Sequence, residues 1–342
     1  MATIAGSQFT ATTPAHPLYV GFDVSGNVPP AHLSDFNLEV FVGGVGNAPA
    51  LDPNYQGLAV LSPSGLQIDL ITGAFAVTDN GTGNDTVAAD GSNETITGGG
   101  AFADQILNGS DNTADGGSGT GLIDVNGTGN TVNADLGGQI VSVNTSGNTV
   151  NVGSGNNVIN IDGDYTTVSG GSGADTIAAA GNNENISAGS GPELINAFGT
   201  GTVLTGGSGN DTLNVFGAGD TIAGGSGLDV LGAFANNVAI FGGTGPSTVV
   251  STGAADTVTA GSGNMFSTAS GLSFQFSDNN TVVYDDTVVG FSNGGSDIIQ
   301  LAAGDTVATS VLVNGGQDTL ITLSDNSTIL LKGVADLTGI IR

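Results

Sequence analysis

The sequence predicts an all-β protein whose main part is a parallel β-roll, or β-solenoid, with 18-residue coils, flanked by small antiparallel β-domains. Two observations predict this class. A nine-residue motif rich in glycine and aspartate recurs on an 18-residue grid, and apolar residues recur at every ninth position through the same region. A fixed period of this kind is the signature of a repeat architecture. The expected organisation is an N-terminal β-domain at 1–79, the solenoid at 80–268 and a C-terminal antiparallel β-module at 269–342.

The motif is GGxGxD-x-apolar-x, and three segments match it without exception: Gly170–Ala178, Gly206–Asn214 and Gly224–Gly232. Their first residues are spaced by 36 and 18 positions, which gives the period. Weaker copies lie in register at 80–88, 116–124, 152–160, 188–196 and 242–250. The copy at 98–106 is displaced by one position, which predicts a β-bulge there. Each half-coil must reverse direction within about six residues, and glycine permits the positive φ that this requires.

The eighth position of the nine-residue units is mostly β-branched or leucine. We expect one short strand per unit, with these side chains stacked in two facing columns that form a thin core. One column holds Val87, Ile123, Val141, Ile159, Ile177, Ile195, Leu213, Leu231 and Val249; the other holds Ile96, Val132, Val150, Val168, Ile186, Leu204, Ile222, Ile240 and Val258.

Charge restricts the partners of this chain. It has 31 acidic residues against two basic ones, Lys332 and Arg342, for a net charge of -29. Such a surface cannot neutralise phosphates, so nucleic acid and anionic membranes are poor partners. No apolar run reaches the roughly 20 residues that membrane insertion requires. The natural partner of many carboxylates is a hard cation with oxygen ligands, above all Ca²⁺.

The nonapeptides resemble those of the RTX, or hemolysin-type, calcium-binding proteins, which form a parallel β-roll and are exported by type I secretion. The resemblance implies that Ca²⁺ binds in the turns, through the acid at the sixth motif position and nearby backbone carbonyl groups. On this chain the implied metal-site residues are Asp175, Asp211 and Asp229, with Glu193 as a substitute, Asp85, and the glycines Gly170, Gly206 and Gly224; on the opposite edge they are Glu184, Asp220 and Asp256.

Electrostatics favour a cation independently of the resemblance. Four carboxylates stacked one coil apart would repel by roughly 3 kcal/mol per adjacent pair at about 5 Å. Other coils carry neutral residues at the sixth position, and stacked asparagines there can hydrogen-bond in a ladder. We therefore predict a calcium-bound half near 170–230 and a largely metal-free half near 105–165. The neutral residues are Gly121, Gln139, Asn157, Ser247 and Met265 on one edge and Asn112, Asn130 and Asn148 on the other.

The two ends of the chain lie outside the repeat. Alternating strands at 286–301 and 318–334, with an Asp-Asn turn at 325–326, predict an antiparallel meander. This segment resembles the terminal module of type I secreted proteins, whose uncleaved C-terminus is the export signal. The N-terminal segment, MATIAGSQFTATTPAHPLYVG, has neither a basic nor an apolar signal-peptide region. The resemblance therefore implies a secreted protein of the extracellular space or cell surface. Strand-like segments within 1–79 are expected to cap or extend the solenoid.

The sequence gives no sign of an enzyme. His16 and His32 have no zinc-ligand spacing, and the chain has neither a GxSxG motif nor a cysteine. The function expected first is structural: a calcium-stiffened subunit that assembles with copies of itself into a fibre, surface layer or extracellular matrix, as in a biofilm. The alternative is an adhesive or ice-binding solenoid, with cell-surface polysaccharide or ice as partner. Its face would be threonine-rich: Thr95, Thr113, Thr131, Thr149, Thr167, Thr221 and Thr257.

Overall fold

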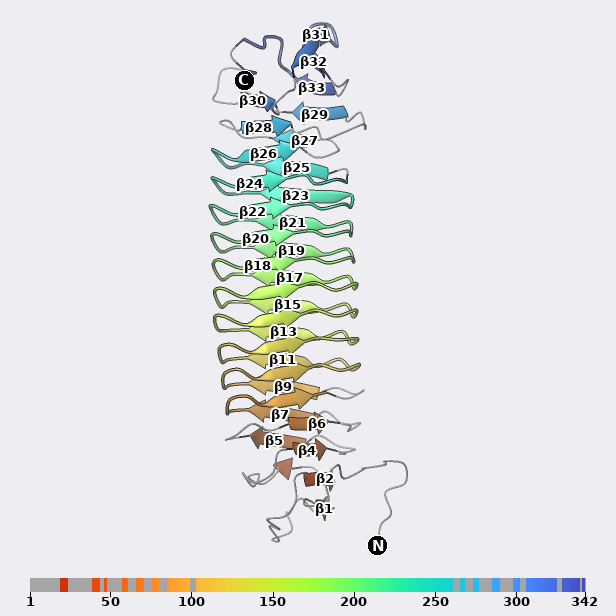
Figure 1. The fold of residues 1–342 in the computed structure, drawn as a ribbon, viewed down its shortest axis with the longest axis vertical. Helices are drawn as coiled ribbons and strands as arrows, with labels where there is room; N and C mark the ends of the chain where they lie inside the picture. The colour runs from red at the N-terminus through yellow and green to blue at the C-terminus, as the bar shows by residue number, and fades with distance from the viewer. Residues whose placement is uncertain are drawn as a thin grey trace. The chain divides into compact units, whose positions relative to one another are not determined.

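The computed structural model describes residues 85–98, 103–245, 247–260, 306–324, 328–338 and 340–341, together with the backbone of further strands outside these ranges. All secondary-structure elements in the described part are β-strands (Figure 1). Within it there is accordingly no helix long and apolar enough to cross a membrane. The chain divides into two units, Met1–Gln139 and Ile140–Arg342, which are described separately.

The first unit contains two parallel sheets. Successive strands of one sheet are joined through the other sheet, which gives the long connections that parallel pairing needs. The strands of the first sheet are β1 (Tyr19–Asp23), β2 (Glu39–Gly43), β4 (Gly57–Val60), β6 (Ala76–Asp79), β8 (Thr95–Thr97), β10 (Thr113–Asp115) and β12 (Thr131–Asn133). Those of the second are β3 (Gly46–Asn47), β5 (Leu66–Leu70), β7 (Asp85–Ala89), β9 (Ala103–Leu107) and β11 (Leu122–Val125).

The pairing at the N-terminus differs from the expectation. The strand-like segments within 1–79 were predicted to cap or extend the solenoid as a small antiparallel domain. The extension is confirmed, because β1, β2, β4 and β6 continue the parallel sheet of the solenoid, and the antiparallel pairing is wrong. The reason is chain length: the segment from Asp23, where β1 ends, to Glu39, where β2 begins, is long enough for a crossover and far longer than a tight hairpin uses. His16 and His32 lie outside the described residues.

The second unit repeats the plan, and as far as β25 and β26 each strand residue pairs with the one a full repeat further along the chain, as in Val158↔Thr176. Figure 1 shows its strands as two ladders of arrows. One sheet contains β14 (Thr149–Asn151), β16 (Thr167–Ser169), β18 (Asn185–Ser187), β20 (Val203–Thr205), β22 (Thr221–Ala223), β24 (Ala239–Phe241), β26 (Thr257–Ala260), β28 (Ser273–Phe276) and β30 (Ile298–Leu301). The other contains β13 (Ile140–Val143), β15 (Val158–Ile161), β17 (Thr176–Ala179), β19 (Leu194–Ala197), β21 (Thr212–Val215), β23 (Asp229–Ala233), β25 (Ser247–Ser251), β27 (Met265–Ser267) and β29 (Asp285–Val289).

A small antiparallel sheet follows at the C-terminus, as expected for 318–334. Strand β32 (Asp318–Leu323) pairs antiparallel with both β31 (Val307–Val313) and β33 (Thr328–Lys332). For 286–301 the antiparallel prediction is wrong, because β29 and β30 pair in parallel with β27 and β28. Strand β33 lies parallel beside β29 and so joins the two kinds of sheet. The Asp-Asn turn at 325–326 lies outside the described residues.

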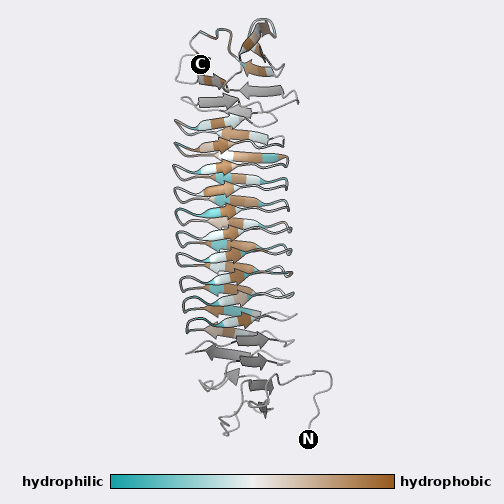
Figure 2. Cartoon of the chain, in the orientation of Figure 1, coloured by the Kyte–Doolittle hydropathy of each residue, from teal (hydrophilic) through white to brown (hydrophobic). Residues whose placement is uncertain are grey.

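The core is built from the predicted columns, and Figure 2 shows apolar residues concentrated on the strands. Every residue of both eighth-position columns is at most 2 % exposed. The four-residue strands also bury a second residue two positions later, as Val143 in β13 and Ile161 in β15 show. Sheets made of these longer strands therefore contribute two inward columns, where the sequence predicted one.

The bulge predicted at 98–106 is wrong. Strand β9 keeps the 18-residue register with both neighbours, so Gln105 pairs with Val87 and with Ile123. Gln105 therefore occupies the inward column and is buried, while Ile106 points outward and is only half-buried. The Gln105 Nε2 donates to the carbonyl of Asp115 at 2.8 Å, while Oε1 is buried without a partner among the described residues. Backbone pairing thus overrides the displaced apolar residue.

Candidate calcium site

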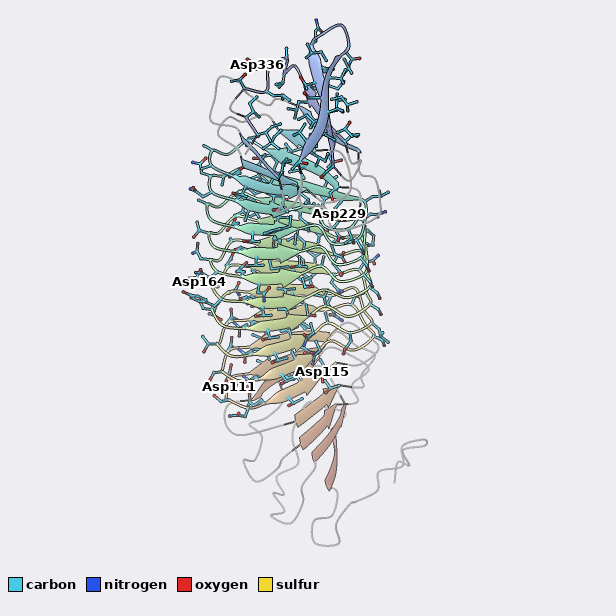
Figure 3. The ribbon with its side chains drawn as sticks, turned by 45° about the horizontal axis from the view of Figure 1, so that its top comes forward. Asp111, Asp115, Asp164, Asp229 and Asp336 are labelled. Carbon is cyan, nitrogen blue, oxygen red and sulfur yellow. The ribbon has the colours of Figure 1, made fainter. Side chains whose placement is uncertain are left out.

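The turns of the solenoid are of two kinds, on opposite edges of the stacked strands. We call those of the GGxGxD units motif turns and the others opposite turns; Figure 3 labels Asp229 in a motif turn and Asp164 in an opposite turn. In both kinds the side chain at the sixth position is buried beneath its turn, at most 5 % exposed, except at Gly121, which has no side chain. The sixth positions of the described motif turns from residue 121 onward are Gly121, Gln139, Asn157, Asp175, Glu193, Asp211, Asp229 and Ser247; those of the opposite turns are Glu94, Asn112, Asn130, Asn148, Thr166, Glu184, Thr202, Asp220, Val238 and Asp256.

One hydrogen bond recurs at these buried positions. The side-chain oxygen accepts from the backbone N–H of the sixth-position residue one full repeat earlier in the chain. Asp229 Oδ1 accepts from Asp211 N–H at 3.0 Å, and Asn130 Oδ1 accepts from Asn112 N–H at 2.7 Å. The same bond is made by Asn112, Gln139, Asp175, Asp211, Asp220 and Asp256. Amides and carboxylates both supply this oxygen, so the bond does not distinguish them.

What distinguishes the turns is the second polar atom of the side chain. In a neutral motif turn, Gln139 Nε2 donates to the carbonyl oxygens of Gly116 and Gly119, at 3.1 and 2.8 Å. The Ser247 hydroxyl likewise donates to the Gly242 carbonyl at 2.7 Å. These glycines hold the first and fourth motif positions. A neutral residue therefore supplies a donor to glycine carbonyl groups of its own turn, as at Ser247, or of the preceding turn, as at Gln139.

An ionised acid has no such donor. In four consecutive motif turns the second oxygen is buried and accepts no hydrogen bond from any described residue. These atoms are Oδ2 of Asp175, Asp211 and Asp229 and both carboxyl oxygens of Glu193. A buried, unpaired polar group costs about 1–3 kcal/mol, and more when it is charged. The four acids therefore require a partner that the described chain does not supply, either a bound proton or a cation.

The motif glycines Gly206 and Gly224 border this space. A Cβ placed on Gly206 would lie 2.0 Å from the Gly224 carbonyl oxygen and 2.8 Å from Asp211 Oδ2. One placed on Gly224 would lie 2.6 Å from the Gly242 carbonyl oxygen and 2.9 Å from Asp229 Oδ2. At both glycines a backbone carbonyl oxygen and a carboxylate oxygen thus lie beside the space that a side chain would fill. At Gly170 a Cβ would overlap the next turn's backbone carbonyl in the same way.

The buried acids are shifted toward the protonated form. Burial, together with the neighbouring carboxylates of Asp211 and Asp175, raises the pKa of Glu193 to about 9. Burial also raises the pKa of Asp175 and of Asp229 above the usual value for aspartate. A low dielectric disfavours the charged form, and like charges one turn away add to the effect. Without a cation, burial and the neighbouring acids favour the protonated form of Glu193.

The predicted acidic ligands in the opposite turns do not occupy successive turns. Both oxygens of Glu184 and Oδ2 of Asp220 are buried and lack hydrogen-bond partners among the described residues. Burial raises their pKa values, to about 8 for Glu184 and about 6 for Asp220. Asp256 is satisfied, because Oδ1 accepts from Val238 N–H at 2.9 Å and Oδ2 accepts from the Ser251 hydroxyl. The sixth positions one turn away from each of these acids are neutral.

One buried acid was missed from the sequence, and one predicted acid cannot be assessed. Glu94 is 1 % exposed, Oε1 has no partner among the described residues, and burial raises its pKa to about 7. Its position could have been found, because it lies one full repeat before Asn112 at the same motif position. Asp85 lies in β7, but its side chain is outside the described residues.

A cation in the motif turns would need backbone ligands as well as acids. Among the residues that the structure describes, no three Asp, Glu, His or Cys side chains come together as a metal site by themselves. Successive acids instead lie one turn apart, beside glycine carbonyl groups. Ca²⁺ fits this donor set best, because it takes six to eight oxygen ligands and accepts carboxylate and carbonyl oxygens in flexible geometry.

Comparison of the chain with protein-family models, curated proteins and solved structures gives no match. The functional inference therefore rests on the buried acids of the motif turns.

Proposed function

We propose that this chain is a calcium-stabilised structural protein of the extracellular space, a non-enzymatic subunit that assembles with copies of itself. The observation that carries the proposal is the run of four buried acids whose second oxygens lack partners among the described residues: Asp175, Glu193, Asp211 and Asp229. Bound between these turns, Ca²⁺ would supply the positive charge that the acids lack. The similarity of the motif to RTX nonapeptides supports the same proposal.

No side chain of the described solenoid can replace the cation. The chain has only two basic residues, and Lys332 pairs with Asp318 in the C-terminal sheet. A proton is the competing partner, since a neutral acid could donate to a turn carbonyl. A proton bonds to one carboxyl oxygen and can be donated to one acceptor, whereas Ca²⁺ can be coordinated by several carboxylate and carbonyl oxygens of a turn at once. We expect the cation to win at neutral pH and millimolar Ca²⁺.

The extracellular assignment follows from affinity. A site built from one or two carboxylates and backbone carbonyl groups belongs with the weak sites of extracellular modules, which bind Ca²⁺ with Kd of about 10⁻⁴–10⁻³ M. Such a site fills only where Ca²⁺ is abundant. The solenoid would then be loaded outside the cell and largely unloaded inside.

The test is the circular dichroism of the full chain at neutral pH, in excess chelator and after addition of millimolar Ca²⁺, with Mg²⁺ as the control cation. We expect β-structure to be lost or strongly destabilised in chelator and restored by Ca²⁺ far better than by Mg²⁺. A spectrum and melting temperature that do not change in chelator, with the metal content measured as zero, would contradict the calcium proposal.

The ice-binding or adhesive alternative keeps one supporting observation. Thr95, Thr113 and Thr131 align across three neighbouring strands of the first unit, and Thr149 aligns with Thr167 in the second. Their side chains are at least partly exposed. The array is interrupted at Asn185 and Val203, which hold the same register, and resumes at Thr221. Thermal hysteresis of the calcium-loaded protein tests the ice-binding function directly, and its absence would leave the structural function.

A further inference from the structure

The C-terminal sheet of the second unit ends in an unusually exposed strand. Strand β31 pairs with β32 along one edge, and within the described part of the chain no residue pairing is recorded along its other edge. Every residue from 308 to 312 is exposed. The outer edge therefore presents a row of backbone N–H and C=O groups without a partner strand.

Strand β31 is exposed on both faces. Val311 is 55 % exposed and Leu312 is 52 % exposed, and adjacent residues of a strand point to opposite faces. The neighbouring strands behave differently: β32 and β33 bury alternate residues such as Ile321 and Leu331 completely. Exposed edge strands are usually protected by charge, proline or a bulge. The sequence VATSVLV has no charge and no proline, and its irregularity lies at one end, between Val307 and Thr309.

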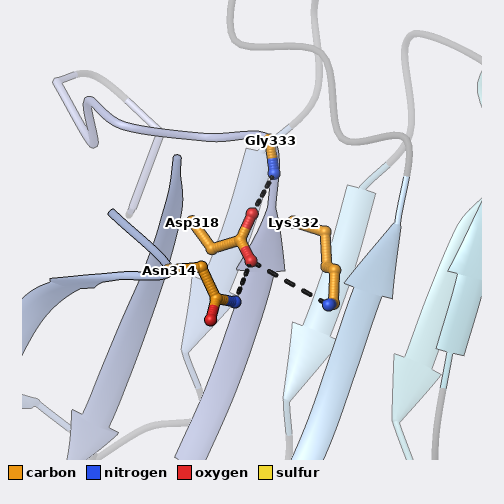
Figure 4. A network of polar contacts seen from close by, with 4 residues as sticks. All are labelled: Asn314, Asp318, Lys332 and Gly333. Carbon is orange, nitrogen blue, oxygen red and sulfur yellow. Dashed lines mark hydrogen bonds and ion pairs between the residues drawn. The ribbon is translucent and has the colours of Figure 1, made fainter. Parts of the chain in front are cut away.

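Charge is also compensated around this strand. The turn after β31 is Asn314-Gly315-Gly316-Gln317, and the one acid beside it, Asp318, is held by three partners (Figure 4). The Asn314 amide donates to Asp318 Oδ2, the Gly333 N–H donates to Oδ1 at 2.9 Å, and Lys332 Nζ lies 3.9 Å from Oδ2. One of the chain's two basic residues thus neutralises the acid of this hairpin.

We propose that the outer edge of β31 pairs with β31 of a second copy of this chain, antiparallel and across a two-fold axis. The inference rests on the self-assembly in the proposed function and specifies one of its contacts. The free backbone edge selects an extended strand as the occupant. A second copy is favoured because a chain of net charge -29 repels itself wherever acids face each other, and among the described residues of this hairpin the one acid, Asp318, is paired with Lys332.

The symmetry of the contact is self-consistent. Two identical strands that pair antiparallel form an isologous interface, in which each copy contributes the same patch. The pair also continues the antiparallel order of β33, β32 and β31. With Ser310 at the centre of the strand, Val311 of one copy faces Thr309 of the other. The exposed Val311 and Leu312 would each gain a cross-strand neighbour on its own face of the joined sheet, Thr309 and Ala308 of the other copy.

The first experiment uses the absence of cysteine from the chain. Ser310→Cys places one thiol at the two-fold axis, where cysteines directly opposite in an antiparallel pair come within the Cα separation of about 4.4–6.8 Å that a disulfide needs. Mild oxidation in Ca²⁺ should give a disulfide-linked dimer. Val203→Cys is the control, because Val203 is exposed at 40 % but sits in β20, which is paired on both sides.

The second experiment measures dimerisation of the full chain by sedimentation under conditions in which circular dichroism shows it folded. Val311→Asp puts an acid on each copy beside the two-fold axis, at diagonal positions about 7–8 Å apart on one face, and should weaken dimerisation about tenfold because the like charges repel. The matched Val203→Asp should leave it unchanged. A folded chain that stays monomeric at its highest soluble concentration, or a dimer insensitive to Val311→Asp, would overturn the inference.

These outcomes are separable from the calcium proposal. A calcium-dependent fold in a strictly monomeric protein would reject the β31 contact alone. A dimer broken by Val311→Asp in a protein whose fold ignores chelator would support the contact and reject calcium.

Discussion

The motif turns near Gln139 and those near Asp211 share a backbone plan but differ in what completes them. In both, the sixth-position oxygen accepts an N–H from the previous turn, at 2.9 Å for Gln139 and 3.0 Å for Asp211. The amide then donates to two glycine carbonyl groups, whereas the carboxylate leaves Oδ2 buried without a partner among the described residues. The neutral turns are complete by themselves, and the acid turns become complete only with a proton or a cation.

One repeat can therefore form both turns that are independent of solution conditions and turns that depend on them. The shared N–H bond holds turn to turn with either residue, so exchanging Asn for Asp does not alter the coil. It changes only whether the turn depends on solution conditions. A solenoid with both kinds of turn would keep structure in its neutral part while its acid part responds to Ca²⁺ and pH. The following experiments test that division.

The largest expected effect comes from the first-position glycines. Gly206→Ala in an acid turn would place a Cβ 2.0 Å from the Gly224 carbonyl oxygen, so the backbone must move. We expect a loss of more than about 4 kcal/mol in the free energy of unfolding, beyond ordinary overpacking. Gly116→Ala in a neutral turn would place its nearest contacts on the Gln139 side chain, at 3.0 Å, and should cost about 1–3 kcal/mol. Chemical denaturation in Ca²⁺ measures both. Equal losses would show that the two turns are packed alike.

The second prediction exchanges acid for amide. Asp211→Asn with Asp229→Asn should keep the inter-turn hydrogen bonds but remove the Ca²⁺ ligands. Each lost site forfeits about 2.7 kcal/mol of stabilisation at a Ca²⁺ concentration roughly 100 times Kd. Asn130→Ala with Asn148→Ala is the control, and it should leave Ca²⁺ affinity nearly unchanged. If calorimetric titration found the same loss of Ca²⁺ affinity in both variants, the prediction that acid turns bind Ca²⁺ and neutral turns do not would be contradicted.

The third prediction concerns pH. Raised pKa values in the folded protein mean that the protonated acids stabilise it at low pH, and that this stabilisation is lost as pH rises through the folded pKa. For Glu193 the window runs from the ordinary 4.5 to about 9. In chelator the melting temperature should therefore fall as pH rises across this window. In Ca²⁺ it should fall much less, because the cation binds the ionised acids. Parallel curves with and without Ca²⁺ would mean that the metal does not bind these acids.

The smallest expected effect lies in the neutral ladder. Asn130→Ala removes the acceptor of the buried Asn112 N–H and the donor to the Gly109 carbonyl. Leaving one buried N–H unpaired should cost about 1–3 kcal/mol. The loss should be the same in Ca²⁺ and in chelator, as measured by denaturant unfolding. A loss that appears only in chelator would link this ladder to the metal.

Much of the fold could be predicted because the repeat encodes it locally. The grid set by Gly170, Gly206 and Gly224 determined the coil length, and the eighth-position residues indicated the inward columns. Failures occurred where the pattern was faint or interrupted. At 98–106 the apolar residue is displaced but the backbone register is not, so Gln105 is buried. Glu94 lies one full repeat before Asn112 and so occupies the same sixth position. It was missed because its own turn does not match the motif.

By itself, the sequence determined the period, the alternation of inward and outward residues and which acids share a motif position. These follow from spacing along the chain, because in a regular coil that spacing fixes where each residue lies on the coil. The tertiary structure alone decided that Asp256 is satisfied by Ser251 while Asp211 Oδ2 has no partner among the described residues. It also decided that β31 presents an open edge within the described part of the chain. Hydrogen-bond partners and free edges depend on groups in other turns and strands, whose approach no local pattern specifies.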